Sequence, residues 1–123
     1  MNTAARCLRV LVVDDEPLIR WSIAETLGAA GHQVAEAEDA ASALRAIKDE
    51  PGPDLVLLDF RLPDSNDLGL LAKIRQMAPN TTVIMMTAFG TPDVTAGALK
   101  LGAAKVLTKP FNMHDLEDVV RAL

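Results

Sequence analysis

Five side chains able to take part in metal or phosphoryl chemistry stand at the ends of short apolar runs. They are Asp14 and Asp15 after Leu8–Val13, Asp59 after Leu55–Leu58, Thr87 after Val83–Met86, and Lys109 after Ala104–Leu107. If the first and third runs are neighbouring parallel strands, their three carboxylates converge and repel one another unless a cation lies between them. A hard cation such as Mg2+ prefers oxygen ligands and keeps waters that a phosphoryl oxygen can replace. Lys109 and the Thr87 hydroxyl would then supply a positive charge and a hydrogen bond to that phosphoryl group.

Each of these side chains also has an ordinary structural explanation. Asp15 could be the N-cap of a helix that begins at Pro17, and Asp59 could be a turn residue. Thr87 could be a simple strand-end hydroxyl, and Lys109 a solvated surface lysine. Coincidence explains complementary groups at four strand ends poorly, so we interpret them together as one site.

The segments that must position this site alternate between apolar runs and helical repeats. The runs Leu8–Val13, Leu55–Leu58 and Val83–Met86 are typical of strands buried on both faces. Gln33–Glu38 and Ala104–Leu107 are more polar, as expected at the edges of a sheet. The helices are predicted to begin at Pro17 and end at Gly28 or Gly31, to span Ala40–Lys48, and to run from Leu68 toward Pro79, from Val94 to Gly102 and from Leu116 to Leu123.

A strand followed by a helix, repeated five times, predicts an α/β protein of the (βα)5 type. Its sheet should be parallel and doubly wound, with right-handed crossovers and helices on both faces. Ligands of such sheets bind outside the carboxyl ends of the strands, where the strand order reverses. The five chemically capable side chains are expected at that edge.

Length and charge restrict the classes of function. The 123 residues suit one domain, 1–123, which we expect to be cut from a longer protein. With 12 Lys and Arg against 17 Asp and Glu, the formal net charge is −5, so direct nucleic-acid binding by this domain is not expected. No apolar run is long enough to cross a membrane, and the chain start lacks the apolar stretch of a signal peptide. Together with the single cysteine, Cys7, these features predict a cytoplasmic location.

Four segments carry a family resemblance that extends over the whole chain. They read VLVVDDEP, VLLDFRLP, VIMMTAFG and LTKPF. At this spacing they closely resemble the receiver domain of bacterial two-component response regulators. The resemblance implies a flavodoxin-like five-stranded sheet in the order 2-1-3-4-5. The IRW at residues 19–21 and the LTKPF segment look most like receivers of nitrogen-regulation-type transcription activators that work with sigma-54.

The resemblance also implies roles for individual residues. Asp59 would accept a phosphoryl group from a sensor histidine kinase. The expected Mg2+ ligands are Asp14, Asp15, Asp59 and the backbone carbonyl of Arg61, and the expected phosphoryl contacts are Lys109, Thr87 and Ala88. The Lys109–Pro110 peptide is expected to be cis, which directs Lys109 into the site. Phosphorylation would change a surface formed by the fourth helix, the fifth strand and the fifth helix, through which a homodimer could form.

Three sequence features bear on the switch. Val106 stands where the family usually has Tyr or Phe, so we expect a switch without an aromatic ring. Residues 64–67 replace a Gly-Met-Asp-Gly-like turn, and Asn66 or Asp67 is expected to make the turn instead. Gly97 weakens the fourth helix by roughly 1 kcal/mol relative to Ala, which marks that helix as a candidate mobile element.

Two aromatic side chains lie outside this set. Trp21 stands two positions off the apolar stripe of its helix, so we expect it to be partly exposed and to pack at the edge of the core instead of forming a partner contact. Phe89 follows Thr87 by two residues and is a candidate to overhang the acceptor. With Arg61, it could modulate the attack of water on an acyl phosphate.

Three other functions compete with a phosphorylation switch. A small aspartate-based phosphatase would need a second acid and a lid, neither of which is evident in the sequence. An FMN carrier would need hydroxyls and amides in the first loop, where Asp14, Asp15 and Glu16 instead repel an uncompensated phosphate. A pseudo-receiver that serves only as an interaction surface is disfavoured by the intact set of site residues.

Overall fold

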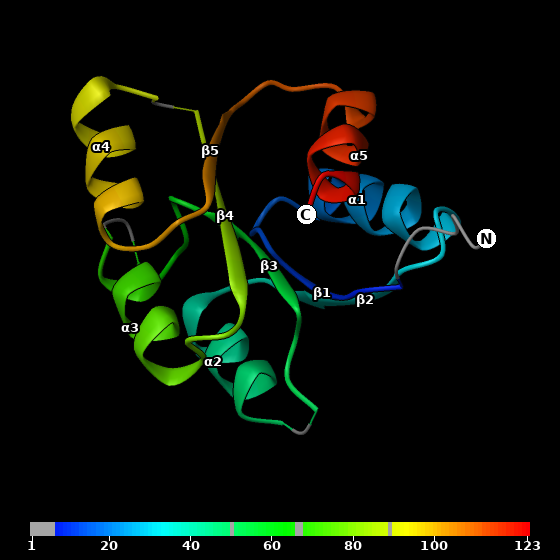
Figure 1. Ribbon diagram of the computed structural model, residues 1–123, viewed down its shortest axis with the longest axis horizontal. Coiled ribbons are helices and arrows are strands. Elements are labelled where there is room, and N and C mark those ends of the chain that lie inside the picture. The colour runs from blue at the N-terminus through cyan, green and yellow to red at the C-terminus, as the bar shows by residue number, and fades with distance from the viewer. Residues whose placement is uncertain (1–6, 50, 66–67, 89) are drawn as a thin grey trace.

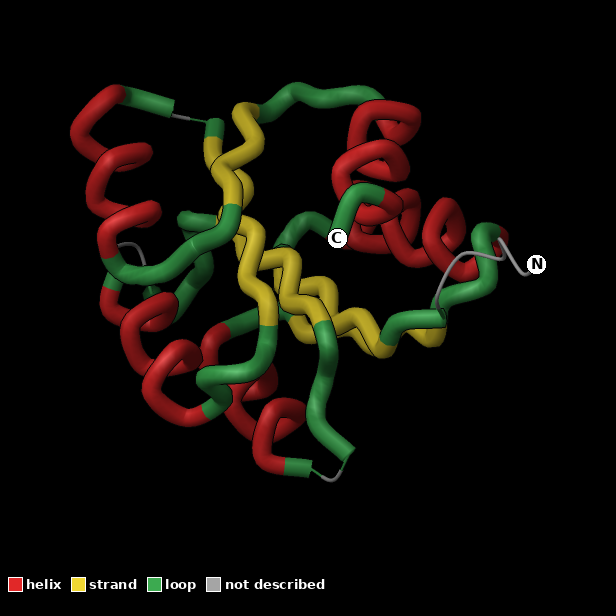
Figure 2. The backbone as a smooth tube through the Cα atoms, viewed as in Figure 1, coloured by secondary structure: helices red, strands yellow, loops and turns green. Residues whose placement is uncertain are grey.

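The protein is one five-stranded parallel sheet with helices on both faces (Figures 1 and 2). The computed structural model describes residues 7–49, 51–65, 68–88 and 90–123. The strands are β1 (Arg9–Val13), β2 (Gln33–Ala37), β3 (Leu55–Asp59), β4 (Thr82–Thr87) and β5 (Lys105–Thr108). The helices are α1 (Pro17–Ala29), α2 (Ala40–Lys48), α3 (Gly69–Met77), α4 (Pro92–Lys100) and α5 (Met113–Arg121). The strand order is β2-β1-β3-β4-β5, so the predicted (βα)5 fold and its topology are confirmed.

Two hydrophobic cores lie on opposite sides of the sheet because successive strand residues point to opposite faces. Leu11 and Val13 of β1 belong to the core beneath α2, α3 and α4, whereas Val10 and Val12 belong to the core beneath α1 and α5. Figure 1 shows the same division of the helices. Coverage on both faces explains why the central strands read as continuous apolar runs. The predicted edge strands, β2 and β5, are indeed more exposed than the central ones.

Specific residues set the helix boundaries. Helix α1 continues through Gly28 to Ala29, and Gly31, with a φ of +99°, follows its end. A positive φ also occurs at Gly102, two residues after α4, as the prediction of a helix end there requires. Helix α4 starts earlier than predicted because the Thr91 side chain accepts a hydrogen bond from the Val94 amide, 3.3 Å away.

Helix α2 has the predicted bounds, and two carboxylates fix its start. Asp39 and Ser42 form a capping box, and these hydrogen bonds lower the pKa of Asp39. Asp64 also accepts hydrogen bonds from the Ala40 and Ala41 amides, at 2.7 and 3.1 Å. Asp64 therefore ties the β3–α3 connection to α2. Asn66 and Asp67, predicted to make the turn of this connection, lie outside the described residues.

Helix α5 ends at Arg121 instead of continuing to Leu123, which is 43 % exposed, so its predicted end was wrong. The expected packing of Trp21 at the edge of the core was also wrong, whereas its partial exposure was expected. Trp21 is 57 % exposed, because the buried side of α1 is formed by Ile23 and Leu27. Among the described residues, no helix is both long and apolar enough to cross a membrane.

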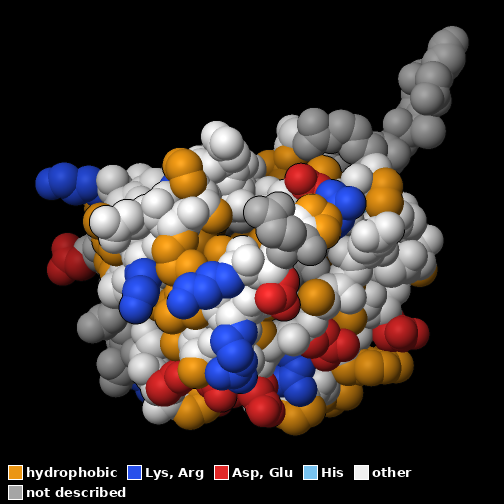
Figure 3. Space-filling view, turned by 90° about the horizontal axis from the view of Figure 1, so that it is seen from below, with side chains coloured by type: hydrophobic (Ala, Val, Ile, Leu, Met, Phe, Trp, Pro, Cys, Tyr) orange, Lys and Arg blue, Asp and Glu red, His pale blue; other side chains and the backbone are white. Residues whose placement is uncertain are grey.

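The surface seen in Figure 3 carries charges of both signs. Several Lys and Arg side chains lie from the left to the lower centre of this view, and Asp and Glu side chains lie mostly below and to the right of them.

Helix α4 approaches the start of α3 closely at Gly97. A Cβ atom at Gly97 would lie 2.8 Å from Cδ1 of Leu68, which is partly buried against the core. Ala98 is the buried residue of α4. Gly97 therefore provides space for a neighbouring side chain, in addition to lowering the helical propensity that the sequence indicates.

Substitution by alanine should separate these two effects. Gly28→Ala meets no atom within 4 Å, so it should stabilise the protein by about 0.5–1 kcal/mol through helix propensity alone. Gly97→Ala should gain less, because the new methyl group displaces Leu68. In a Leu68→Ala background, Gly97→Ala should recover the full gain. Urea unfolding of the single and double variants measures this, and an equal effect of Gly97→Ala in both backgrounds would contradict the steric explanation.

Candidate functional site

A cleft of about 350 Å3 opens at the carboxyl ends of the strands. It lies where the strand order reverses between β1 and β3, as the topology predicts. Its lining residues are Asp15, Glu16, Asp59, Phe60, Arg61, Leu62, Pro63, Thr87, Ala88 and Lys109. The structure therefore brings together the side chains that the sequence places at separate strand ends.

Three carboxylates form an acidic cluster in and behind this cleft. One oxygen from each of Asp14, Asp15 and Asp59 lies within 4.8 Å of the others. Asp59 is the last residue of β3, and Asp14 directly follows β1, the strand paired with β3. Asp14 is fully buried and Asp59 is 6 % exposed. Burying like charges at this separation requires compensating positive charge.

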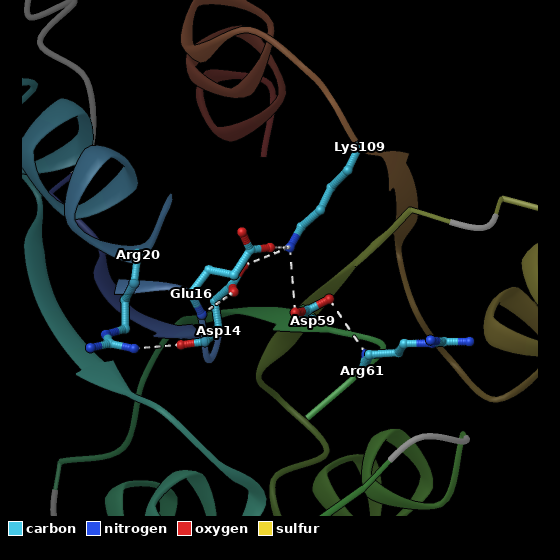
Figure 4. Close-up of polar contacts among 6 residues, drawn as sticks. All are labelled: Asp14, Glu16, Arg20, Asp59, Arg61 and Lys109. Carbon is cyan, nitrogen blue, oxygen red and sulfur yellow. Dashed lines mark hydrogen bonds and ion pairs between the residues drawn. The ribbon is translucent and has the colours of Figure 1, made fainter. Parts of the chain in front are cut away.

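Lys109 supplies part of that compensation (Figure 4). Its Nζ atom lies 2.8 Å from Asp14 Oδ2, 3.3 Å from Asp59 Oδ2 and 3.8 Å from Glu16 Oε1. The lysine side chain is only 12 % exposed, so its interpretation as a solvated surface residue is wrong. The Lys109–Pro110 peptide is cis, as predicted. One lysine charge does not balance three carboxylates, so the cluster is a candidate site for a cation.

Asp14 and Asp15 occupy different positions in the cluster. Asp14 Oδ1 accepts a hydrogen bond from the Glu16 amide at 2.9 Å, and its Oδ2 accepts one from Lys109. Asp15 and Asp59 line the cleft, with Asp14 behind them. The N-cap residue of α1 is Glu16, and it makes no side-chain capping bond. The interpretation of Asp15 as a helix cap is therefore wrong.

The surroundings shift two pKa values. Burial raises the pKa of Asp59 from 3.8 to about 6, and the charge of Asp14 adds to this effect. The Lys109 charge and the Arg61 amide, 3.4 Å from Asp59 Oδ1, oppose the rise. Burial also acts to lower the pKa of Lys109, but its hydrogen bond to Asp14 and the charge of Asp59 outweigh burial and raise it. Near neutral pH, the Lys109 side chain therefore carries a full positive charge.

The remaining predicted residues lie near Asp59. Thr87 ends β4, is 1 % exposed and lines the cleft beside Ala88. Its main-chain oxygen accepts a hydrogen bond from the Lys109 amide at 2.7 Å, which joins the ends of β4 and β5. The Arg61 side chain points away from Asp59 (Figure 4). Phe89, predicted to overhang the acceptor, lies outside the described residues.

Two residues beside the site were not predicted from the sequence. The Arg20 guanidinium donates hydrogen bonds to the main-chain oxygen of Asp14 at 2.6 Å and to Glu36 Oε1 at 3.0 Å. Arg20 follows Glu16 by one helical turn, and this spacing was the available sequence signal for its place near the acidic loop. The contact to Glu36 on β2 depends on the fold.

Comparisons with known proteins agree with the fold. The model of the family described as response regulator receiver domain matches residues 10–121. Response regulator protein PilR of Pseudomonas aeruginosa is 41 % identical over 112 residues, which cover 91 % of this chain and 25 % of that protein. The DNA-binding transcriptional regulator NtrC of Azospirillum brasilense is 36 % identical over 115 residues, which cover 93 % and 24 %. This chain thus spans about a quarter of these relatives.

A solved structure of similar length shows the same architecture. The CheY-like response regulator receiver domain protein of Methanospirillum hungatei superposes with a TM-score of 0.89 at 31 % identity. The match covers 95 % of this chain and 93 % of that one. With a family match over almost all its residues and the same fold, this chain belongs to the response regulator receiver domain family.

Proposed function

We propose that this chain is a phosphorylation switch in which Asp59 accepts a phosphoryl group from a sensor histidine kinase. The observation that carries the proposal is the position of Asp59, which lines the cleft beside Asp15 while Lys109 contacts its carboxylate. A carboxylate oxygen of Asp59 attacks phosphorus as the phosphorus–nitrogen bond of phosphohistidine breaks. The histidine nitrogen leaves with the bonding electron pair, and Asp59 becomes an acyl phosphate.

The acidic cluster fits a divalent cation. Its ligand atoms are carboxylate oxygens within 4.8 Å of one another, and this hard donor set suits Mg2+. Asp14, Asp15, Asp59 and the Arg61 carbonyl would hold the ion. The bound ion would neutralise charge on the phosphoryl oxygens.

Residues of this chain then position the phosphoryl group. Lys109 binds its oxygens while keeping its bond to Asp14, and the Thr87 hydroxyl and the Ala88 amide complete the contacts. Because transfer requires positioning and charge neutralisation, no further acid or base is needed. The domain catalyses its own modification, with no external substrate turned over.

Phosphorylation of Asp59 would change the surface formed by α4, β5 and α5. Inward movement of Thr87 pulls the end of β4, to which α4 is connected. Val106 on β5 is half-buried against the core and pairs in register with Met85, so an aliphatic side chain occupies the switch position. We infer that a second copy of the chain docks on this surface when Asp59 is phosphorylated. The domain would act in the cytoplasm within a longer transcription regulator whose other parts bind DNA.

The acceptor assignment predicts selective chemical labelling. Acetyl phosphate should add one phosphoryl group to the protein when Mg2+ is present and none in EDTA. Asp59→Asn should abolish labelling, whereas Asp118→Asn, an exposed carboxylate on α5, should leave it unchanged. Intact mass measures the product. Persistent stoichiometric labelling of the Asp59→Asn variant at another residue would overturn the assignment.

The raised pKa of Asp59 predicts that ionisation of this group lowers the free energy of unfolding. With a pKa of about 6 in the folded state and 3.8 as its ordinary value, the folded protein binds the Asp59 proton more tightly. The stabilisation that comes from protonated Asp59 is therefore fully present below about pH 4 and is lost as the pH rises through about 6. Asp59→Asn in EDTA should be more stable than the parent by about 1–3 kcal/mol at pH 7.5, with no advantage at pH 3.5. Urea unfolding at both values tests this, and a constant difference would contradict it.

The cluster also predicts stabilisation by Mg2+. An ion that binds only the folded state raises the melting temperature by mass action. Asp15→Asn should reduce this Mg2+ shift and should melt slightly higher than the parent in EDTA, because one repelling charge is gone. Glu16→Gln is the matched control, since Glu16 lines the cleft outside the three-carboxylate cluster. Equal Mg2+ shifts in the parent and Asp15→Asn would remove Asp15 from the site.

A further inference from the structure

Arg20 connects the acidic loop to the edge of the sheet. Its side chain is 16 % exposed and lies between the end of β1 and strand β2. One guanidinium nitrogen donates to the Asp14 main-chain oxygen at 2.6 Å, and Nε donates to Glu36 Oε1 at 3.0 Å. Figure 4 shows the first of these bonds beside the contacts of Lys109. The proposed mechanism assigns Arg20 no contact with the phosphoryl group or the cation.

The Asp14 oxygen belongs to the peptide unit that joins Asp14 to Asp15. Because a peptide unit is planar, holding its oxygen also fixes the direction in which the chain continues to Asp15. Neighbouring groups of the loop are held as well. The Asp14 amide donates to the Ala37 oxygen at 3.1 Å, and the Arg20 amide donates to the Glu16 oxygen at 3.0 Å. The Arg20 side chain thus secures the peptide that lies between these two bonds.

The geometry uses the shape of arginine as well as its charge. A guanidinium presents several donors in a rigid fork, so it can bind a carbonyl and a carboxylate at the same time. Glu36 balances the Arg20 charge and holds the guanidinium on the β2 side. A lysine carries one nitrogen on a flexible chain and would not keep both bonds in the same directions.

We propose that Arg20 is a positioning residue for cation binding, which orients the Asp14–Asp15 peptide so that the Asp15 carboxylate faces Asp59. The inference rests on the proposed function, because it assumes that the acidic cluster binds a divalent cation. Groups that orient metal ligands typically contribute 10–100-fold to metal affinity. Arg20 would act through Asp15 without touching the ion.

Charge and orientation predict opposite effects on Mg2+ affinity. If Arg20 acts only through its charge, it repels Mg2+, and removing that charge tightens Mg2+ binding. If Arg20 orients the Asp14–Asp15 peptide, its loss weakens Mg2+ binding. The sign of the change therefore distinguishes the two roles.

The experiment is a calorimetric Mg2+ titration of the whole 123-residue chain and its variants at pH 7.5. Arg20→Gln and Arg20→Lys should each raise the Kd for Mg2+ by about tenfold. Glu36→Gln should raise it less, because the bond to Asp14 remains. Arg121→Gln, which removes an exposed arginine on α5, is the control and should leave the Kd unchanged. Amide exchange at Asp15 in EDTA should be faster in Arg20→Lys, which reports the orientation without any metal.

The outcomes separate this inference from the proposed function. A parent protein that binds no Mg2+ would overturn both. A parent that binds Mg2+ while both Arg20 variants stay within twofold of its Kd would overturn the role of Arg20 alone, as would tighter binding by Arg20→Gln. If Arg20→Gln fails to fold, Arg20→Lys still decides. A Kd equal to that of the parent would then show that the two directed guanidinium bonds are not needed for Mg2+ binding.

Discussion

The burial of two like charges side by side is the constraint on which the site depends. Asp14 and Asp59 end up in contact range because β1 and β3 are neighbours, although 45 residues separate them in the sequence. Their charges are tolerable because Lys109, from the far edge strand, reaches both carboxylates. The sheet order is therefore an electrostatic requirement as well as a topological one. Without β5 beside β4, the positive charge would not reach the cluster.

Lys109 also links the charge state of the site to the ends of β4 and β5. Its side chain contacts Asp59, while its amide donates a hydrogen bond to the main-chain oxygen of Thr87. A phosphoryl group on Asp59 would change the forces on this lysine and, through the backbone, on the ends of β4 and β5. Helix α4 is suited to respond, because Ala98 is its buried residue and Gly97 gives it room against Leu68.

The sequence allowed prediction of whatever depends on local pattern. Continuous apolar runs identified the central strands, and the residues that follow them identified the members of the site. Contacts between distant segments could not be read in this way. The capping of α2 by Asp64 and the bridge from Arg20 to Glu36 require knowledge of which loops meet. The spacing of Trp21 indicated its exposure, but whether it packs at the edge of the core depends on its neighbours in space.

If Asp59 is the acceptor proposed above, its pKa explains why Lys109 would be needed before phosphorylation as well as after it. A nucleophilic carboxylate must be ionised, yet burial and the Asp14 charge push the pKa of Asp59 upward. The Lys109 charge and the Arg61 amide limit that rise to about 6, so that most of the Asp59 population is ionised near neutral pH. A fully solvated aspartate would ionise more readily, but it would lack the desolvated surroundings in which charge neutralisation is strong. The proposed acceptor is thus buried, with enough positive charge beside it to keep its carboxylate ionised.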